Sequence, residues 1–315
     1  MPLLAPRLTL AALLTLSWSA VLTADTVHRT FAVAEGGRLD LKADVGSIDV
    51  QSGGSGVDVR IERIDNPKDF DTTVEQQGND VVVRLKYRGA TSFFHWFDNG
   101  QVRFVVTVPR RYNLLLDTAG GDIRIGDLEG EVKCHTSGGS LRFGKIVGPV
   151  DGSTSGGSIV VGGSVGRLIV KTSGGDIRIT DSRGPAEART SGGSVEIEHV
   201  DGDVLARSSG GSIHIADVAG AVDADTSGGS VTARITRQPT GDSRLSTSGG
   251  GVRVEIASNV AVDLDAHTSG GEVSTDIPVT VVGKQDESDL KGKINGGGPR
   301  LVLRSSGGGI HVSRF

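Results

Sequence analysis

Three acidic residues are the first candidates for chemistry in this sequence, because they recur in one register: Asp151, Glu187 and Asp223. Clustered carboxylates are the groups with which enzymes on β-helical scaffolds cleave polysaccharides. These acids alternate with apolar Ile169 and Leu205, and aromatic residues that could stack on sugar rings are scarce in the same part of the chain. A polysaccharide-active enzyme is therefore the least favoured function that we consider.

Other catalytic, cofactor and metal signals are weak. The stretch from Gly139 to Lys145 resembles a phosphate-binding loop, but Ile146 stands where a Ser or Thr would hold the metal ion. The seven histidines are scattered without ligand spacing. Cys134 occupies a register of small inward residues, where a buried thiol is inert. We therefore predict no catalytic residue, no cofactor and no metal site.

A basic column is the first candidate interaction surface. It is formed by Lys171, Arg189 and Arg207, which follow one another at intervals of 18 residues. Like charges at strand spacing repel each other, so an anionic ligand could account for the column. In the alternative interpretation, which we favour, Glu187 and other nearby acids neutralise it.

An aromatic cluster is the second candidate surface: Phe93, Phe94, Trp96 and Phe97. Exposed aromatic patches mark binding tips or loops that touch membranes. A cluster of this kind more often plugs the end of a hydrophobic core, and we favour that interpretation.

A glycine repeat provides the scaffold for these residues. Glycine makes up 48 of the 315 residues, about twice its usual share. Gly-Gly pairs recur at intervals of 18 residues, beginning at 120, 138, 156, 174, 192, 210 and 228, and further pairs begin at 249, 270 and 307. A fixed period of this length indicates a solenoid.

Each 18-residue unit contains two alternating apolar segments, such as Leu141/Phe143 and Val150/Gly152, separated by a single glycine. Alternation with period two indicates strands with one buried face. The sequence therefore predicts an all-β fold, a parallel β-solenoid with one 18-residue unit per coil. An antiparallel meander is the rival, and a left-handed hexapeptide helix is excluded because apolar residues do not recur every six positions.

The domain boundaries follow from the same pattern. Residues 25–315 are expected to form a single solenoid domain, with degenerate coils over 25–117 that cap the stack. Regular Gly-Gly coils cover 118–277, and an insertion with a C-terminal coil covers 278–315.

The Gly-Gly corner is expected to need glycine for close backbone stacking and positive φ. The preceding threonines continue the inward-facing series of the second strand, where their hydroxyls can hydrogen-bond from coil to coil: Thr136, Thr154, Thr172, Thr190 and Thr226. We expect Gly174→Val to destabilise the rod locally.

Residues 1–24 are typical of a secretory signal peptide, with Arg7, an apolar run from Leu8 to Leu16, and small residues at the end. The apolar run is shorter than the roughly 20 residues of a membrane span. The chain is therefore expected to be exported, with no integral membrane segment in its mature form. The net charge of −5 argues against nucleic acid as a partner. A single cysteine allows no internal disulfide.

Four stretches resemble a known bacterial family: 31–50, 102–125, the TSGGSI units from 136 onward, and 290–312. Together they resemble the "putative adhesin" β-strand-repeat family, a domain of unknown function related to the Toastrack domains. The resemblance implies an all-β solenoid, export or association with the cell envelope, and no known catalysis.

The favoured function is thus a non-enzymatic, adhesin-like interaction module of the periplasm or cell surface. Its partner would be an envelope protein or a surface glycan, with end-to-end self-association as a further possibility. The alternative is a periplasmic envelope-stress or signalling accessory that binds a membrane protein.

Overall fold

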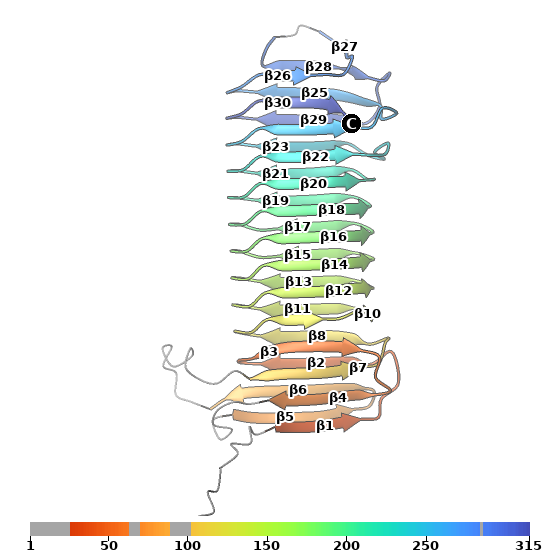
Figure 1. Ribbon diagram of the computed structural model, residues 1–315, viewed down its shortest axis with the longest axis vertical. Coiled ribbons are helices and arrows are strands. Elements are labelled where there is room, and N and C mark those ends of the chain that lie inside the picture. Colours follow the sequence, from red (N-terminus) through yellow and green to blue (C-terminus); the bar gives the residue numbers. More distant parts are fainter. Residues whose placement is uncertain (1–25, 63–69, 89–101, 284–285) are drawn as a thin grey trace, which may run out of the picture.

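The computed structural model describes residues 26–62, 70–88, 102–283 and 286–315. Two long, mainly parallel β-sheets lie face to face and form a rod, which Figure 1 shows with its strands stacked along the long axis. Every regular element in the described ranges is a strand. No helix among the described residues has the length and apolarity that a membrane crossing requires.

The strands of sheet A, in spatial order, are β1 (Thr26–Phe31), β4 (Val57–Glu62), β7 (Arg103–Val108), β3 (Ser47–Ser52), β9 (Ile123–Ile125), β12 (Leu141–Val147), β14 (Ile159–Val165), β16 (Ile177–Arg183), β18 (Val195–Asp201), β20 (Ile213–Val218), β22 (Val231–Ile235), β24 (Val252–Ile256), β30 (Ile310–Arg314) and β26 (Val273–Thr275), with β10 (Leu128–Glu129) also beside β12.

The strands of sheet B, in spatial order from the other end, are β27 (Thr280–Val281), β28 (Asp289–Ile294), β25 (Val262–Thr268), β29 (Arg300–Ser305), β23 (Ser243–Thr247), β21 (Val222–Thr226), β19 (Val204–Ser208), β17 (Ala186–Arg189), β15 (Leu168–Lys171), β13 (Val150–Thr154), β11 (Val132–Thr136), β8 (Asn113–Thr118), β2 (Arg38–Ala43), β6 (Asp80–Tyr87) and β5 (Phe70–Gln77).

Each coil gives one strand to each sheet. Strand β12 in sheet A is followed by β13 in sheet B, and then β14 returns to sheet A beside β12. Equivalent residues of successive coils pair in parallel, such as Leu141 with Ile159 and Val150 with Leu168. The predicted parallel solenoid is therefore confirmed, and the antiparallel meander is excluded for the regular coils.

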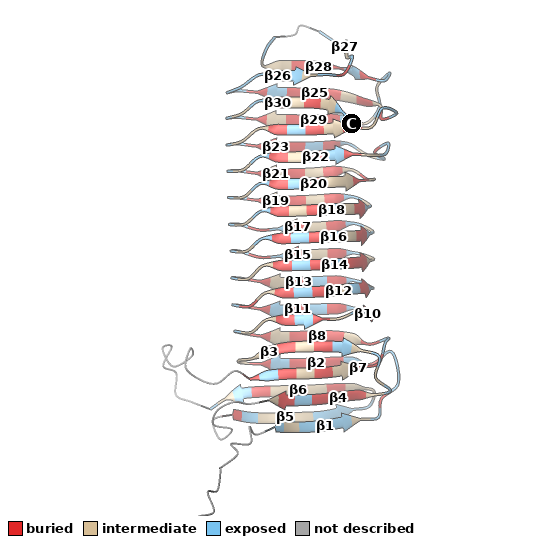
Figure 2. Ribbon diagram, viewed as in Figure 1, coloured by how far each residue is buried: buried red, intermediate tan, exposed pale blue. Residues whose placement is uncertain are grey.

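The hydrophobic core fills the space between the sheets, and buried residues alternate with more exposed ones along the strands of the regular coils (Figure 2). The large Phe143 ring lies opposite Gly152, where a Cβ would come within 2.9 Å of the ring. Large and small residues thus complement each other across the core. Cys134 lies in the same inward register as Gly152 and is buried, as predicted.

The two corners of a coil use glycine for different reasons. At the single-glycine corner, Gly148 and Gly166 have φ of 144° and 126°, a region that disfavours side chains. At the Gly-Gly corner, a Cβ on Gly175 would lie only 2.3 Å from the carbonyl oxygen of Gly157 in the preceding coil. The positive φ expected at the Gly-Gly corner was wrong, because none of the glycines in the Gly-Gly pairs from 120 to 271 or at 307–308 has one. Close backbone stacking excludes the side chain at the second glycine of the pair.

The N-terminal end departs from the predicted run of degenerate coils. Strands β2 and β3 do form a parallel coil beside β8 and β9. However, β6 and β7 lie on the other side of that coil, and β1, β4 and β5 pair antiparallel. Antiparallel pairing lets the chain double back with short turns, so this end is a mixed cap rather than a series of coils in chain order.

The C-terminal end also departs from chain order. Strand β29 lies between β23 and β25, and β30 lies between β24 and β26. The last coil in the sequence is thus inserted between two earlier coils. Strand β28 pairs antiparallel with β25 on its outer side, so β25 has a neighbour on both edges.

Candidate functional surfaces

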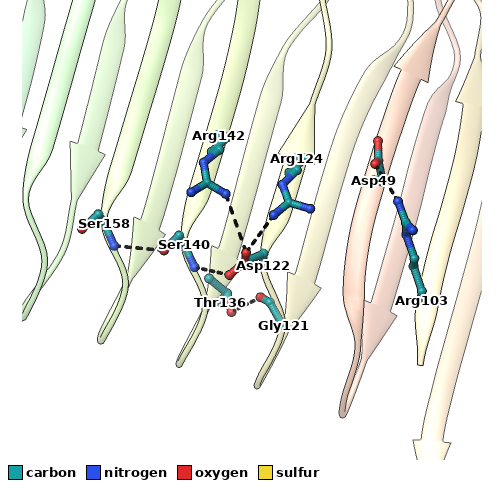
Figure 3. A network of polar contacts seen from close by, with 9 residues as sticks. All are labelled: Asp49, Arg103, Gly121, Asp122, Arg124, Thr136, Ser140, Arg142 and Ser158. Atoms are coloured by element: carbon teal, nitrogen blue, oxygen red, sulfur yellow. Dashed lines mark hydrogen bonds and ion pairs between the residues drawn. The ribbon is translucent and has the colours of Figure 1, made fainter. Parts of the chain in front are cut away.

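The threonine two residues before most Gly-Gly pairs, replaced by Ser208 and Ser305 in two coils, forms a ladder of hydrogen bonds at the corner. The Thr136 hydroxyl donates to the Gly121 carbonyl at 2.8 Å (Figure 3). It also accepts from the Gly139 N–H at 3.3 Å. Thr154, Thr172 and Thr190 repeat both bonds in the following coils. The predicted coil-to-coil bonding of these hydroxyls is confirmed. Each of these hydroxyls donates to a backbone carbonyl of the preceding coil, so the threonines hold neighbouring coils together at the corner.

The residue after each Gly-Gly pair forms a second ladder. The Ser140 N–H donates to the Asp122 carboxylate at 2.9 Å, and the Ser158 N–H donates to the Ser140 hydroxyl at 3.3 Å (Figure 3). The same bond recurs from coil to coil up to the Gly251 N–H, which donates to the Ser230 hydroxyl at 3.3 Å. Each side chain in this column therefore caps one backbone donor of the next coil.

Ion pairs lie on the solvent-facing side of sheet A, near the Gly-Gly corner. Asp122 contacts Arg124 at 3.3 Å and Arg142 at 3.8 Å, and Asp49 contacts Arg103 at 3.4 Å (Figure 3). Apart from Asp49, these side chains are substantially exposed, and exposed pairs of this kind contribute little to stability.

The basic column on sheet B is ion-paired. Glu187 lies between Lys171 at 3.4 Å and Arg189 at 2.8 Å, and Arg207 contacts Asp223 at 2.6 Å. Burial alone raises the pKa of Glu187, but hydrogen bonds and charge from Arg189 and Lys171 hold that pKa below its ordinary value of 4.5. The hydrogen bond to Asp223 raises the pKa of Arg207. The geometry matches the interpretation in which nearby acids neutralise the column.

The acids considered for polysaccharide cleavage are distributed over the same face. Glu187 and Asp223 line a shallow groove of about 340 Å³ with Asp203 and Asp242. Each of these acids already has a partner: Asp203 accepts from the Ala221 N–H, and Asp242 pairs with Arg300 at 2.8 Å. Asp151 lies outside the groove, on β13.

The other sequence candidates add no site. The aromatic cluster Phe93, Phe94, Trp96 and Phe97 lies outside the described residues. Within the described ranges, no three His, Cys, Asp or Glu side chains gather as metal ligands. Burial raises the pKa of the Cys134 thiol strongly, as expected for an inert thiol.

A groove on sheet A was missed from the sequence. It has a volume of about 350 Å³ and lies over β22, β24, β30 and β26, lined among others by Gly251, Gly309, Arg253, Glu272 and His311. The sequence did carry a signal, because TSGGG at 247–251 and SSGGG at 305–309 replace the usual final Ser or Asp by Gly. This change of residue is informative only once the side chain at this position is known to accept a backbone N–H of the next coil.

Several solved structures are similar to this chain at low identity. A "putative adhesin" from Parabacteroides merdae has 13% identity and a TM-score of 0.37, with 94% of this chain and 97% of that chain covered. A "putative adhesin" from Bacteroides fragilis has 16% identity and a TM-score of 0.31, with coverage of 93% and 98%. A "putative lipid binding protein" from Parabacteroides distasonis has 8% identity and a TM-score of 0.27, with coverage of 92% and 97%. These values are too low to support an inference about function.

No curated protein matches the chain. A family model does match it, described as Toastrack DUF4097, over residues 38–313. This range spans both sheets of the rod, from β2 to β30. The chain therefore belongs to the Toastrack DUF4097 family.

Proposed function

We propose that this chain is a non-enzymatic, exported interaction module of the bacterial cell envelope, which acts in an adhesin-like way. The observation that carries the proposal is how the polar groups of the regular coils are used. The hydroxyls of the two corner ladders hold successive coils together. Glu187 and Asp223 are ion-paired with Lys171 and Arg207. Such groups support a rigid scaffold, and a scaffold presents surfaces to partners.

Export is proposed from residues 1–24, whose pattern is that of a signal peptide. Surface and periplasmic locations are separated by treating intact cells with protease. Cleavage in intact cells is expected for a surface-exposed adhesin. Protection in intact cells combined with cleavage after the outer membrane is opened would favour the periplasmic accessory instead.

The interaction itself is tested by recovery of partners from envelope extracts. Immobilised full chain is expected to retain a specific envelope protein or glycan, and a chain lacking 91–99 tests the aromatic cluster as the binding tip. If the deletion recovers the same partner in the same amount, the cluster is not the binding tip. If the intact chain retains nothing above a bare resin, the interaction module itself is wrong.

The enzymatic alternative is tested with a panel of polysaccharides. The proposal predicts no turnover by the wild-type chain. Turnover that disappears in Glu187→Gln or Asp151→Asn would establish an enzyme and overturn the non-enzymatic proposal.

A further inference from the structure

The second corner ladder is interrupted at two successive coils near the C-terminal end of the rod. Gly251 and Gly309 stand in the column that holds Ser140, Ser194 and Ser230 in other coils. They are neighbours in space, because Val252 pairs with Ile310 and the Val252 N–H donates to the Gly309 carbonyl at 3.0 Å. Glu272 follows them in the column, since Val273 pairs with Ile310.

The interruption leaves two backbone donors uncapped. In the regular coils, the N–H of each column residue donates to the side chain of the preceding one. Gly251 and Gly309 have no side chain, so the N–H groups of Gly309 and Glu272 find no acceptor within the part of the chain that the structure describes. A Cβ on Gly251 would lie 3.8 Å from the Gly309 nitrogen, and a Cβ on Gly309 would lie 3.8 Å from the Glu272 nitrogen. The free donors therefore face the missing side chains.

The surrounding groove contains both donors and acceptors. Arg253 lies beside the gap on β24, and the next acid along that strand, Glu255, pairs with Arg234 at 2.6 Å instead. His311 is held by the Ser274 hydroxyl at 3.0 Å from Nδ1 and by Asp276 at 3.3 Å from Nε2. The Glu272 side chain, an acceptor, forms part of the lining and is exposed.

We propose that this groove, which we call the glycine notch (Gly251, Gly309, Glu272, Arg253 and His311), binds a pyranose ring of a saccharide. The proposal rests on the adhesin-like function and names its ligand class. The two free N–H groups are one coil apart, about 4.8 Å, which suits two oxygens on alternate carbons of a sugar ring. The Glu272 carboxylate accepts a hydrogen bond from a sugar hydroxyl, and Arg253 donates one to a further oxygen.

A small anion fits the notch less well than a sugar. Arg253 supplies one positive charge to the lining, but Glu272 supplies a negative charge there, and Asp276 adds another next to His311. The two oxygens of a carboxylate are also too close together to occupy both gaps in the column. Hydroxyl groups, which both donate and accept, match this mixed lining.

The notch can be closed with the residue that the other coils already use. Gly251→Ser combined with Gly309→Ser would restore the ladder, because neither glycine has a positive φ. The new Cβ atoms would lie 2.9 and 3.1 Å from the neighbouring carbonyl oxygens, so small backbone adjustments are needed. Gly241→Ser is the matched control, because its Cβ would meet the nearest atom at an ordinary 3.7 Å.

The test is a titration of the ¹⁵N-labelled full chain with methyl β-glucopyranoside and with the methyl glycoside of N-acetylglucosamine. At least one of these sugars should shift the amide signals of Gly309 and Glu272 in a saturable way. The affinity should fall at least tenfold in the double serine variant and remain unchanged in Gly241→Ser. Arg253→Gln should weaken sugar binding, whereas Arg244→Gln, on sheet B, should not. These two variants test the notch if the double serine variant does not fold.

Three results would overturn the notch as a saccharide site. The first is that neither sugar shifts the amide signals of Gly309 and Glu272, and the second is that the wild type and the double variant bind with equal affinity. The third is that these amide signals shift in a titration with acetate but not with either sugar. The proposed function is tested separately by envelope recovery with the same variants. Undiminished recovery together with no sugar response would remove the notch and leave the interaction module standing. No recovery by the wild-type chain would remove the module whatever the titration shows.

Discussion

The two glycines of a Gly-Gly pair should differ sharply in their tolerance of alanine. A Cβ on Gly175 would lie 2.3 Å from the Gly157 carbonyl oxygen, more than 1 Å short of an ordinary contact of about 3.4 Å. A Cβ on Gly174 would lie 3.2 Å from the Gly156 carbonyl oxygen, which requires a shift of a few tenths of an ångström. The two variants have the same composition and the same loss of chain entropy, so they isolate the stacking contact.

The expected magnitude follows from the bonds at this corner. The Gly157 carbonyl accepts the buried Thr172 hydroxyl at 2.8 Å, and the Gly174 N–H donates to the Ser155 carbonyl at 2.9 Å. Leaving a buried polar group unpaired costs about 1–3 kcal/mol, and weakening a neighbouring bond costs about 0.5–1.5 kcal/mol. Alanine returns about 0.4–1 kcal/mol through the unfolded chain. We therefore expect Gly175→Ala to lower the free energy of unfolding by about 2–3 kcal/mol.

Gly174→Ala should change the free energy of unfolding by no more than about 0.5 kcal/mol. Urea denaturation measures the difference, and hydrogen exchange of the Gly174 amide locates it, because local opening in a solenoid need not involve the whole rod. Equal losses in the two variants would refute the claim that backbone stacking, rather than glycine content, sets the corner. The earlier expectation for Gly174→Val concerns the more tolerant of the two positions.

Three further predictions follow from the ladders, the ion pairs and the core. Thr172→Val should destabilise the chain by about 1–3 kcal/mol, because it leaves the Gly157 carbonyl and the Gly175 N–H without their partner. The exposed control Thr180→Val should have little effect, and a comparable loss of urea midpoint in both variants would contradict the ladder. Because the pKa of Glu187 is lowered in the folded chain, its ion pairs stabilise the fold above its ordinary pKa of 4.5, and this contribution is lost as pH falls through the lower folded value. Glu187→Gln should therefore reduce the loss of melting temperature at acid pH. An unchanged dependence of melting temperature on pH would contradict the stabilising role of these ion pairs. The buried Cys134 thiol, whose pKa is raised by burial, should react with iodoacetamide at pH 8 only after unfolding, so rapid labelling of the native chain would show that its burial is wrong.

The regular coils could be predicted from the sequence because every physical signal there has the same period. Leu141 and Ile159, 18 residues apart, are direct neighbours in sheet A. The ends could not be predicted in this way. Arg300–Ser305 pairs with both Ser243–Thr247 and Val262–Thr268, and no local pattern shows that a later coil lies between two earlier ones.

The candidate surfaces were predicted less completely than the fold. The basic column could be identified because Lys171, Arg189 and Arg207 share a register, but its ion pairs depend on side-chain geometry. The glycine notch could not be predicted, because two additional glycines form no distinctive pattern in a chain that contains 48 of them. Gly251 and Gly309 become informative only when Ser140 and Ser194 are seen to cap backbone donors.

The central claim is that repeated residues build the rod and that ligand recognition occurs where the repeat is broken. It is tested most directly by mapping amide shifts over the whole chain during a saccharide titration. The account predicts that the shifts centre on Gly309 and Glu272 and that the amides of the intact column, such as Ser158 and Ser212, do not move. Shifts spread evenly along that column, with no maximum at Gly309 and Glu272, would contradict it.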